Sequence, residues 1–121
     1  MPKKTTREIG NEGEDLACAY LENKDWEILE RNYFFGKSEI DIIARDNRII
    51  VFIEVKLRSS IKYGRPEEYV TEDKVEHVFS AAEAWMHERE MGDLPMRFDV
   101  IGILQKKNET PEFTHIEDAF R

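Results

Sequence analysis

Two apolar runs separated by a short polar turn constrain the fold of this chain more than any other feature. Residues 38–45 and 49–57 are rich in β-branched and aliphatic side chains. The three residues between them, 46–48, read Asp-Asn-Arg and favour a tight turn. The sequence therefore predicts a β-hairpin.

Both runs carry carboxylates in their interior, at Glu39, Asp41 and Glu54. Moving a carboxylate out of water costs several kcal/mol, so a chain that needed only a stable core would have little reason to interrupt these runs with acids. We therefore expect the acids to serve a chemical role that offsets this cost.

The hydrophobic pattern also selects the register of the predicted hairpin. Side chains alternate between faces along a strand, and a pairing in which residue numbers sum to 93 or 95 gives one wholly apolar face. That face is predicted to hold Ile40, Ile42, Ala44, Val51, Ile53 and Val55. The other face is predicted to collect Glu39, Asp41, Glu54 and Lys56. An even sum would scatter acids among aliphatic side chains on both faces.

Three acids and one lysine cannot neutralise one another in a partly dry site, whereas a divalent cation would balance them. Carboxylate oxygens are the hard ligands that Mg²⁺ prefers, and its remaining positions take water and substrate phosphate oxygens. We predict that Asp41 and Glu54 hold Mg²⁺ or Mn²⁺, with Glu39 beside them. Lys56 would orient a metal-activated water or stabilise charge on the phosphate. The competing interpretation is a set of strand ion pairs at the edge of the sheet.

The rest of the chain predicts one α/β domain over residues 1–121, with residues 1–9 as a flexible arm. Apolar residues recur at helical spacing in two segments, and shorter β-branched or aromatic runs mark three further strands. The predicted helices are 11–24 and 72–90, and the additional strands are 26–33, 98–103 and 113–116.

Charge limits the classes of partner. The net charge of -8 argues against coating nucleic acid by bulk electrostatics. Residues 31–65, however, hold eight Lys or Arg against four acids, a local net charge of +4 that would attract phosphate. The chain lacks an apolar run of the ~20 residues that a membrane span needs, and its start does not read as a secretory signal, so we expect a cytoplasmic protein without membrane contact.

The other metal-binding residue types give no site. Cys18 cannot form an internal disulfide and is predicted to be a core or boundary residue. His77, His87 and His115 lack the spacing of a zinc site and are predicted to be surface residues.

Asp41 followed by Glu54-Val55-Lys56 resembles the PD-(D/E)xK pattern of restriction-endonuclease-like nucleases. From about residue 10 to residue 120 the chain is similar to the YraN-type family of bacterial proteins, which is related to archaeal Holliday-junction resolvases. The residues that carry this resemblance are Gly13-Glu14, Glu39-Ile40-Asp41, residues 51–56, Arg58, Val70-Thr71, Lys74, Phe98-Asp99-Val100 and Asp118-Ala119-Phe120.

The resemblance implies a restriction-endonuclease-like fold, a central mixed β-sheet flanked by α-helices. It also implies that Glu14 and the Val55 carbonyl join the metal site, and that the substrate is DNA, including branched or junction DNA. The chain departs from the family pattern after Lys74, where Val75-Glu76-His77 replaces positions that are often basic. This departure weakens the case for duplex DNA but leaves the metal site unchanged.

Two functions follow from the sequence. The first is a Mg²⁺-dependent endonuclease, which would act as a homodimer if it cut both strands. The second is a non-catalytic module that binds nucleic acid or protein on a nuclease-like fold. The residues predicted to contact DNA are Arg58, Lys62, Arg65 and Lys74.

Overall fold

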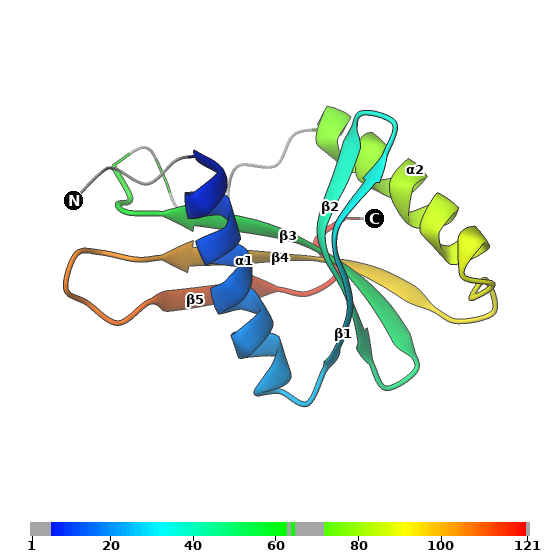
Figure 1. The fold of residues 1–121 in the computed structure, drawn as a ribbon, viewed down its shortest axis with the longest axis horizontal. Coiled ribbons are helices and arrows are strands. Elements are labelled where there is room, and N and C mark those ends of the chain that lie inside the picture. Colours follow the sequence, from blue (N-terminus) through cyan, green and yellow to red (C-terminus); the bar gives the residue numbers. More distant parts are fainter. Residues whose placement is uncertain (1–5, 63, 65–71, 121) are drawn as a thin grey trace.

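The computed structural model describes residues 6–62, 64 and 72–120, and of residues 6–10 and 72–74 only the backbone. Its elements are α1 (Thr6–Glu22), β1 (Glu27–Phe35), β2 (Ser38–Asp46), β3 (Ile49–Arg58), α2 (Glu72–Glu88), β4 (Met96–Leu104) and β5 (Glu112–Ile116). The strands form one sheet in the order β1-β2-β3-β4-β5 (Figure 1). Strands β3 and β4 are parallel and every other pair is antiparallel. The predicted fold class, a mixed sheet flanked by helices of the restriction-endonuclease type, is confirmed.

The predicted elements agree with the structure except at the start of the chain. Helix α1 begins at Thr6, so residues 6–9, predicted to belong to a flexible arm, are helical. Residues 1–5 of the predicted arm lie outside the described residues.

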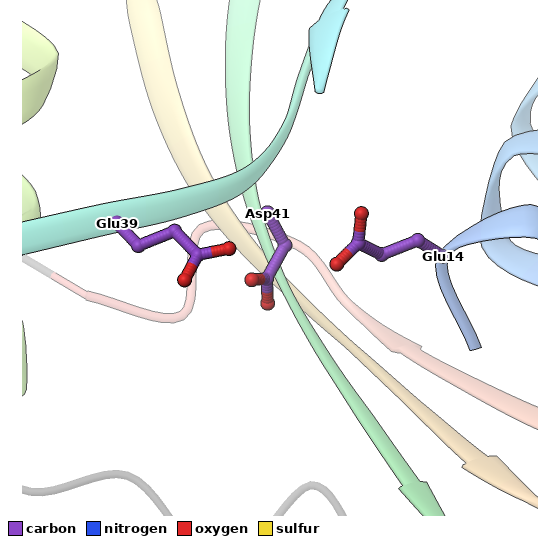
Figure 2. A group of neighbouring side chains, drawn as sticks. All are labelled: Glu14, Glu39 and Asp41. Carbon is purple, nitrogen blue, oxygen red and sulfur yellow. The ribbon is translucent and has the colours of Figure 1, made fainter. Parts of the chain in front are cut away.

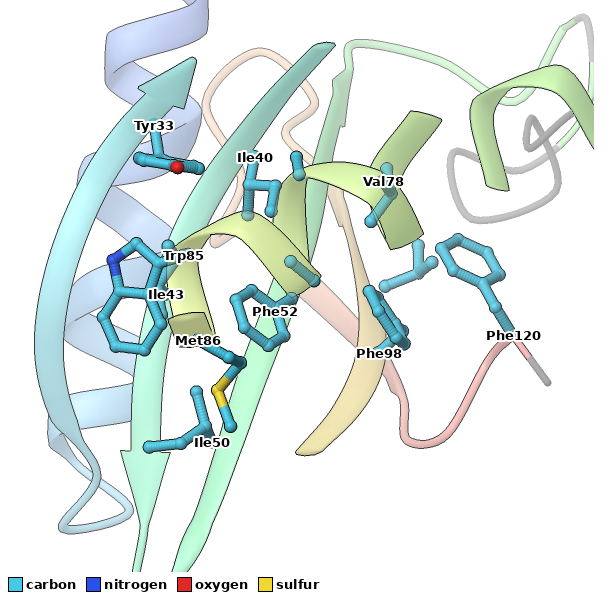
Figure 3. Close-up of a cluster of buried hydrophobic side chains, with 13 residues drawn as sticks. Tyr33, Ile40, Ile43, Ile50, Phe52, Val78, Trp85, Met86, Phe98 and Phe120 are labelled. Carbon is cyan, nitrogen blue, oxygen red and sulfur yellow. The ribbon is translucent and has the colours of Figure 1, made fainter. Parts of the chain in front are cut away.

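The two helices cover opposite faces of the sheet. Helix α2 buries Val78, Ala82 and Trp85 against a core that includes Phe52 and Phe98 (Figure 3). Helix α1 packs on the other face, over a second core built by the following buried residues. They are Ala17, Cys18, Leu21, Trp26, Ile42, Ala44, Val51, Ile53, Ile101 and Ile103. Because β3 is buried on both faces, it reads as an almost continuous apolar run.

The hairpin of β2 and β3 has the predicted odd register. Ile42 pairs with Ile53 and Ala44 with Val51, so the paired numbers sum to 95. The prediction that Ile40 shares a face with Ile42 is wrong, because Ile40 packs with Ile43 in the core under α2. The pairing of β2 with β3 ends at Ile42. Strand β2 therefore changes its facing at Asp41, between Ile40 and Ile42.

Among the described residues, neither helix is long and apolar enough to cross a membrane.

Candidate metal centre

Three carboxylates meet where β2 departs from β3. Glu39 and Asp41 come from β2 and Glu14 comes from α1, and Figure 2 shows their side chains pointing toward one another. One carboxylate oxygen from each lies within 4.8 Å of the other two. We call these three residues the acidic cluster. It joins Glu14 to residues that lie 25 and 27 positions later in the sequence, and it sits where β2 changes its facing.

Asp41 is the centre of this cluster. Its Oδ2 accepts a hydrogen bond of 2.8 Å from the Val55 backbone N–H, so the side chain reaches the backbone of β3 beyond the last β2–β3 residue pair. Burial raises the pKa of Asp41, the charge of Glu54 raises it further, and the Val55 N–H only partly opposes them; the resulting pKa is about 8. Metal-free Asp41 therefore holds its proton at neutral pH.

Glu14 reaches the cluster because α1 approaches β3 unusually closely. A Cβ on Gly13 would lie 3.1 Å from the Leu57 Cβ, so the glycine allows the helix to lie against the strand. Glu14 itself is 7% exposed, and burial raises its pKa against the opposing effects of Arg31 and Asn32. Among the described residues its Oε1 is the buried side-chain polar atom that has no hydrogen-bond partner. An orphaned buried carboxylate oxygen is costly unless a cation binds it.

Arg31 supplies positive charge at one side of the cluster. Its Nη2 lies 3.6 Å from Glu14 Oε1, beyond hydrogen-bond range, while its Nη1 lies 2.8 Å from Asp15 Oδ1. The guanidinium is thus shared with an exposed acid outside the cluster. The three carboxylates of the cluster therefore outweigh the charge that Arg31 brings to them.

The structure places Glu54 and Lys56 beside the acidic cluster but pairs them with each other. Lys56 Nζ lies 3.3 Å from Glu54 Oε1, and the Glu54 side chain is 7% exposed. Glu54 is close enough for its charge to raise the pKa of Asp41, although it is not one of the three carboxylates within 4.8 Å. The predicted role of the Val55 carbonyl as a ligand stays a prediction, because Val55 contacts Asp41 through its N–H.

The acidic cluster fits a hard divalent cation. Mg²⁺ binds oxygen at about 2.0–2.1 Å, so its ligands lie roughly 3–4 Å apart. Carboxylate oxygens within 4.8 Å of one another would reach that spacing with shifts of about 1 Å, which side-chain rotations supply. The donor set is all oxygen and includes the orphaned Glu14 Oε1. A bound cation would also remove the repulsion that raises the pKa of Asp41.

The residues predicted to contact DNA are only partly described. Arg58 is exposed at the end of β3, where Arg58, Glu12, Leu57, Ser59 and Gln105 line a shallow hollow. Lys62 is exposed in the following turn. Arg65 and the side chain of Lys74 lie outside the described residues. Arg58 and Lys62 thus lie at the end of β3 beyond Glu54 and Lys56.

A further buried acid, Asp99 on β4, was not predicted from the sequence to form a buried ion pair. It is fully buried and accepts two hydrogen bonds from Arg97, one from the Asp118 backbone N–H and a contact of 2.7 Å from His115 Nε2. The prediction that His115 is a surface residue is wrong, since its side chain is 5% exposed between Asp99 and the rings of Tyr20 and Trp26. His77 and His87 are exposed, as predicted.

One sequence signal could have identified Asp99. It is a carboxylate inside the apolar stretch FDVIGIL, and Arg97 lies two residues earlier on the same face of the strand. The same reasoning that singled out Glu39, Asp41 and Glu54 applies to it.

Comparison with known proteins places the chain in a family. Residues 13–103 match the family described as "Uncharacterised protein family UPF0102". The chain belongs to UPF0102. A UPF0102 protein of Geotalea daltonii is 43% identical over 118 residues, which are 98% of this chain and 93% of the relative. A UPF0102 protein of Flavobacterium johnsoniae is 39% identical over 116 residues, covering 93% of this chain and 94% of the relative. The UPF0102 match includes all three members of the acidic cluster as well as Glu54 and Lys56.

Proposed function

We propose that this UPF0102 protein is a divalent-cation-dependent endonuclease that hydrolyses phosphodiesters of DNA. The observation that carries the proposal is the acidic cluster: three converging carboxylates, one of them with a buried oxygen that lacks a hydrogen-bond partner. Glu54 and Lys56 stand at its edge. This is the donor set for Mg²⁺ or Mn²⁺ next to a cation that can serve a phosphate.

Each residue has a distinct role in this proposal. Glu14, Glu39 and Asp41 would hold the cation, and Glu54 would join them or hydrogen-bond a water that the cation carries. The cation, when bound, supplies Lewis acidity toward the phosphate and lowers the pKa of a bound water. Lys56 exchanges its contact with Glu54 for one with a nonbridging phosphate oxygen, where its charge stabilises the transition state. The Val55 N–H keeps Asp41 oriented throughout.

The proposed substrate is DNA, with branched structures as the leading class because of the resemblance to junction resolvases. Arg58, Lys62, Arg65 and Lys74 would contact phosphates flanking the cleaved bond, and a homodimer would supply two sites for cutting two strands. If these contacts form, log affinity falls linearly with log salt, and replacing Arg58 and Lys62 with Ala reduces that slope.

The test is cleavage of end-labelled four-way junction, flap, linear duplex and single-stranded DNA with Mg²⁺ or Mn²⁺. The variants are Asp41→Asn and Lys56→Ala, and the matched control is Asp46→Asn, the same substitution at the other end of β2. We expect the parent and Asp46→Asn to cleave at equal rates. We expect Asp41→Asn and Lys56→Ala to lose at least about 100-fold, because each removes charge stabilisation of the transition state.

The result that would contradict the proposal is equal cleavage by the parent and Asp41→Asn, or no cleavage of any substrate under conditions where Mn²⁺ binds. DNA binding without cleavage would instead support the non-catalytic module. The protein's acidity, a net charge of -8, is the observation that favours that second function.

A further inference from the structure

Two phenylalanine side chains are exposed to solvent at the turn between β1 and β2. Phe34 is 64% exposed and Phe35 is 45% exposed, and Phe34 is the most exposed large apolar side chain of the described residues. Gly36, with a φ of +60°, and the exposed Lys37 complete the turn. Neither ring belongs to the two buried cores, so fold stability does not account for them.

The register of the β1–β2 pair separates the two rings. Phe34 pairs directly with Glu39, a member of the acidic cluster, whereas Phe35 pairs with Ser38. Side chains of directly opposed residues project to the same side of a hairpin, and consecutive residues project to opposite sides. Phe34 therefore stands beside Glu39 with its Cα about 5 Å from that of Glu39, and Phe35 faces away.

We propose that Phe34 is a stacking platform for one unpaired base of the substrate, next to the phosphate bound at the acidic cluster. The inference rests on the proposed function and specifies its substrate: nucleic acid in which at least one nucleotide flanking the scissile phosphate is unpaired. A base in continuous duplex is covered by its neighbours on both faces, so it cannot offer a free face to the ring.

The size of the surface favours a base over a protein partner. One phenylalanine buries at most about 250 Å², whereas a stable protein interface needs about 800 Å² on each side. Phe35 does not extend the surface of Phe34, because the two rings project to opposite sides of the hairpin. The polar neighbours also suit a nucleotide. Lys37 offers a cation for phosphate in the same turn, and the acidic cluster, which includes the Glu39 that pairs with Phe34, would hold a cation that binds phosphate.

The experiment compares Phe34→Ala with Phe35→Ala, which serves as the matched control from the same turn and the opposite side. The probes are a short single-stranded oligonucleotide containing 2-aminopurine and the duplex of the same sequence, each titrated with protein in Ca²⁺. Ca²⁺ supplies a hard cation for the cluster. Anisotropy reports affinity, and quenching of 2-aminopurine fluorescence reports stacking on the ring.

We expect Phe34→Ala to bind the single strand about 5- to 150-fold more weakly and to lose the quenching, the range that one base–aromatic stack gives. Phe35→Ala and Phe34→Trp should keep both, and duplex affinity should be the same for all four proteins. Both substituted positions are exposed, so folding is preserved.

Three results would overturn the inference: unchanged single-strand binding by Phe34→Ala, equal loss in Phe34→Ala and Phe35→Ala, or a change of sedimentation coefficient in Phe34→Ala that shows the ring holds two protein copies together. Failure of the proposed function is recognised separately. If the protein stacks the base through Phe34 but never cleaves, this inference stands and the proposed nuclease function fails. If Phe34→Ala still cleaves duplex and single strand alike, the proposed nuclease function stands and this inference fails.

Discussion

Two aspartates of the sheet, the half-buried Asp41 on β2 and the buried Asp99 on β4, have opposite surroundings. Asp99 is fully buried, yet Arg97, His115 and a backbone N–H satisfy both of its oxygens. Asp41 receives one N–H, from Val55, and stands among other acids. Burial raises the pKa of both side chains. Hydrogen bonds nevertheless bring the pKa of Asp99 below its ordinary value. For Asp41, the negative charge of neighbouring acids adds to burial, and the pKa rises to about 8.

This difference is why we assign Asp99 a structural role and propose a metal-binding role for Asp41. Asp99 is compensated within the chain, so its charge stabilises the fold at neutral pH and loses that effect as pH falls through its lowered pKa. Asp41 is not compensated within the chain, so its ionisation works against the fold. A carboxyl group whose ionisation the protein itself disfavours is a candidate for binding a cation that would balance the charge.

The largest expected effect comes from neutralising the compensated acid. Asp99→Asn leaves Arg97, whose side chain is 16% exposed, with the exposed Glu117, 3.9 Å away, as its remaining anionic partner. Breaking a buried ion pair in this way costs about 3–5 kcal/mol. The free energy of unfolding, measured by urea denaturation at pH 7, should fall by that amount, against a change within about 0.5 kcal/mol for Asp46→Asn on β2. A loss below about 1 kcal/mol in Asp99→Asn would remove the contrast between the two aspartates.

The same substitution at Asp41 should act in the opposite direction and depend on pH. Because the folded-state pKa of Asp41 is raised from 3.8 to about 8, the folded protein holds a proton that the unfolded chain releases, and stability falls as pH rises between these values. One such proton is worth up to about 1.4 kcal/mol per pH unit. Without metal, the parent should lose about 3–4 kcal/mol relative to Asp41→Asn between pH 5 and pH 8.

Urea denaturation of both proteins in chelator across this range measures the effect. Parallel stability curves for the parent and Asp41→Asn would show that the charge of Asp41 is already balanced inside the protein.

The hairpin and its register could be predicted from the sequence because the apolar pattern has few solutions. Only an odd sum keeps the acids off a face shared with Val51 and Ile53, and the observed sum is 95. The order of helices and strands along the chain could be predicted for the same reason, because the apolar residues of each segment recur with a clear period of 2 or 3.6. The change of facing at Asp41 was not predicted, because strict alternation assumes that the whole strand stays paired in one sheet, whereas the pairing of β2 with β3 ends at Ile42 and the Val55 N–H binds the Asp41 side chain instead.

Only some of the residues of the candidate site could be predicted from the sequence. Asp41 and Glu54 lie 13 residues apart on two strands of one hairpin, so their proximity follows from a local turn. Glu14 enters from α1 through the close approach at Gly13, a tertiary contact that spacing does not encode and that only the family resemblance suggested. The burial of His115 likewise depends on Asp99, its partner on the neighbouring strand.

The central claim is that the acidic cluster is a divalent-cation site, and metal-dependent thermal stability tests it most directly. The parent, Asp41→Asn and Asp46→Asn are melted in chelator and in increasing Mn²⁺ or Mg²⁺. A cation that binds only the folded protein stabilises it by about 1.4 kcal/mol at ten times its Kd. We predict a saturable rise in Tm for the parent and Asp46→Asn and none for Asp41→Asn. Equal shifts in all three proteins, or none in the parent, would contradict the claim.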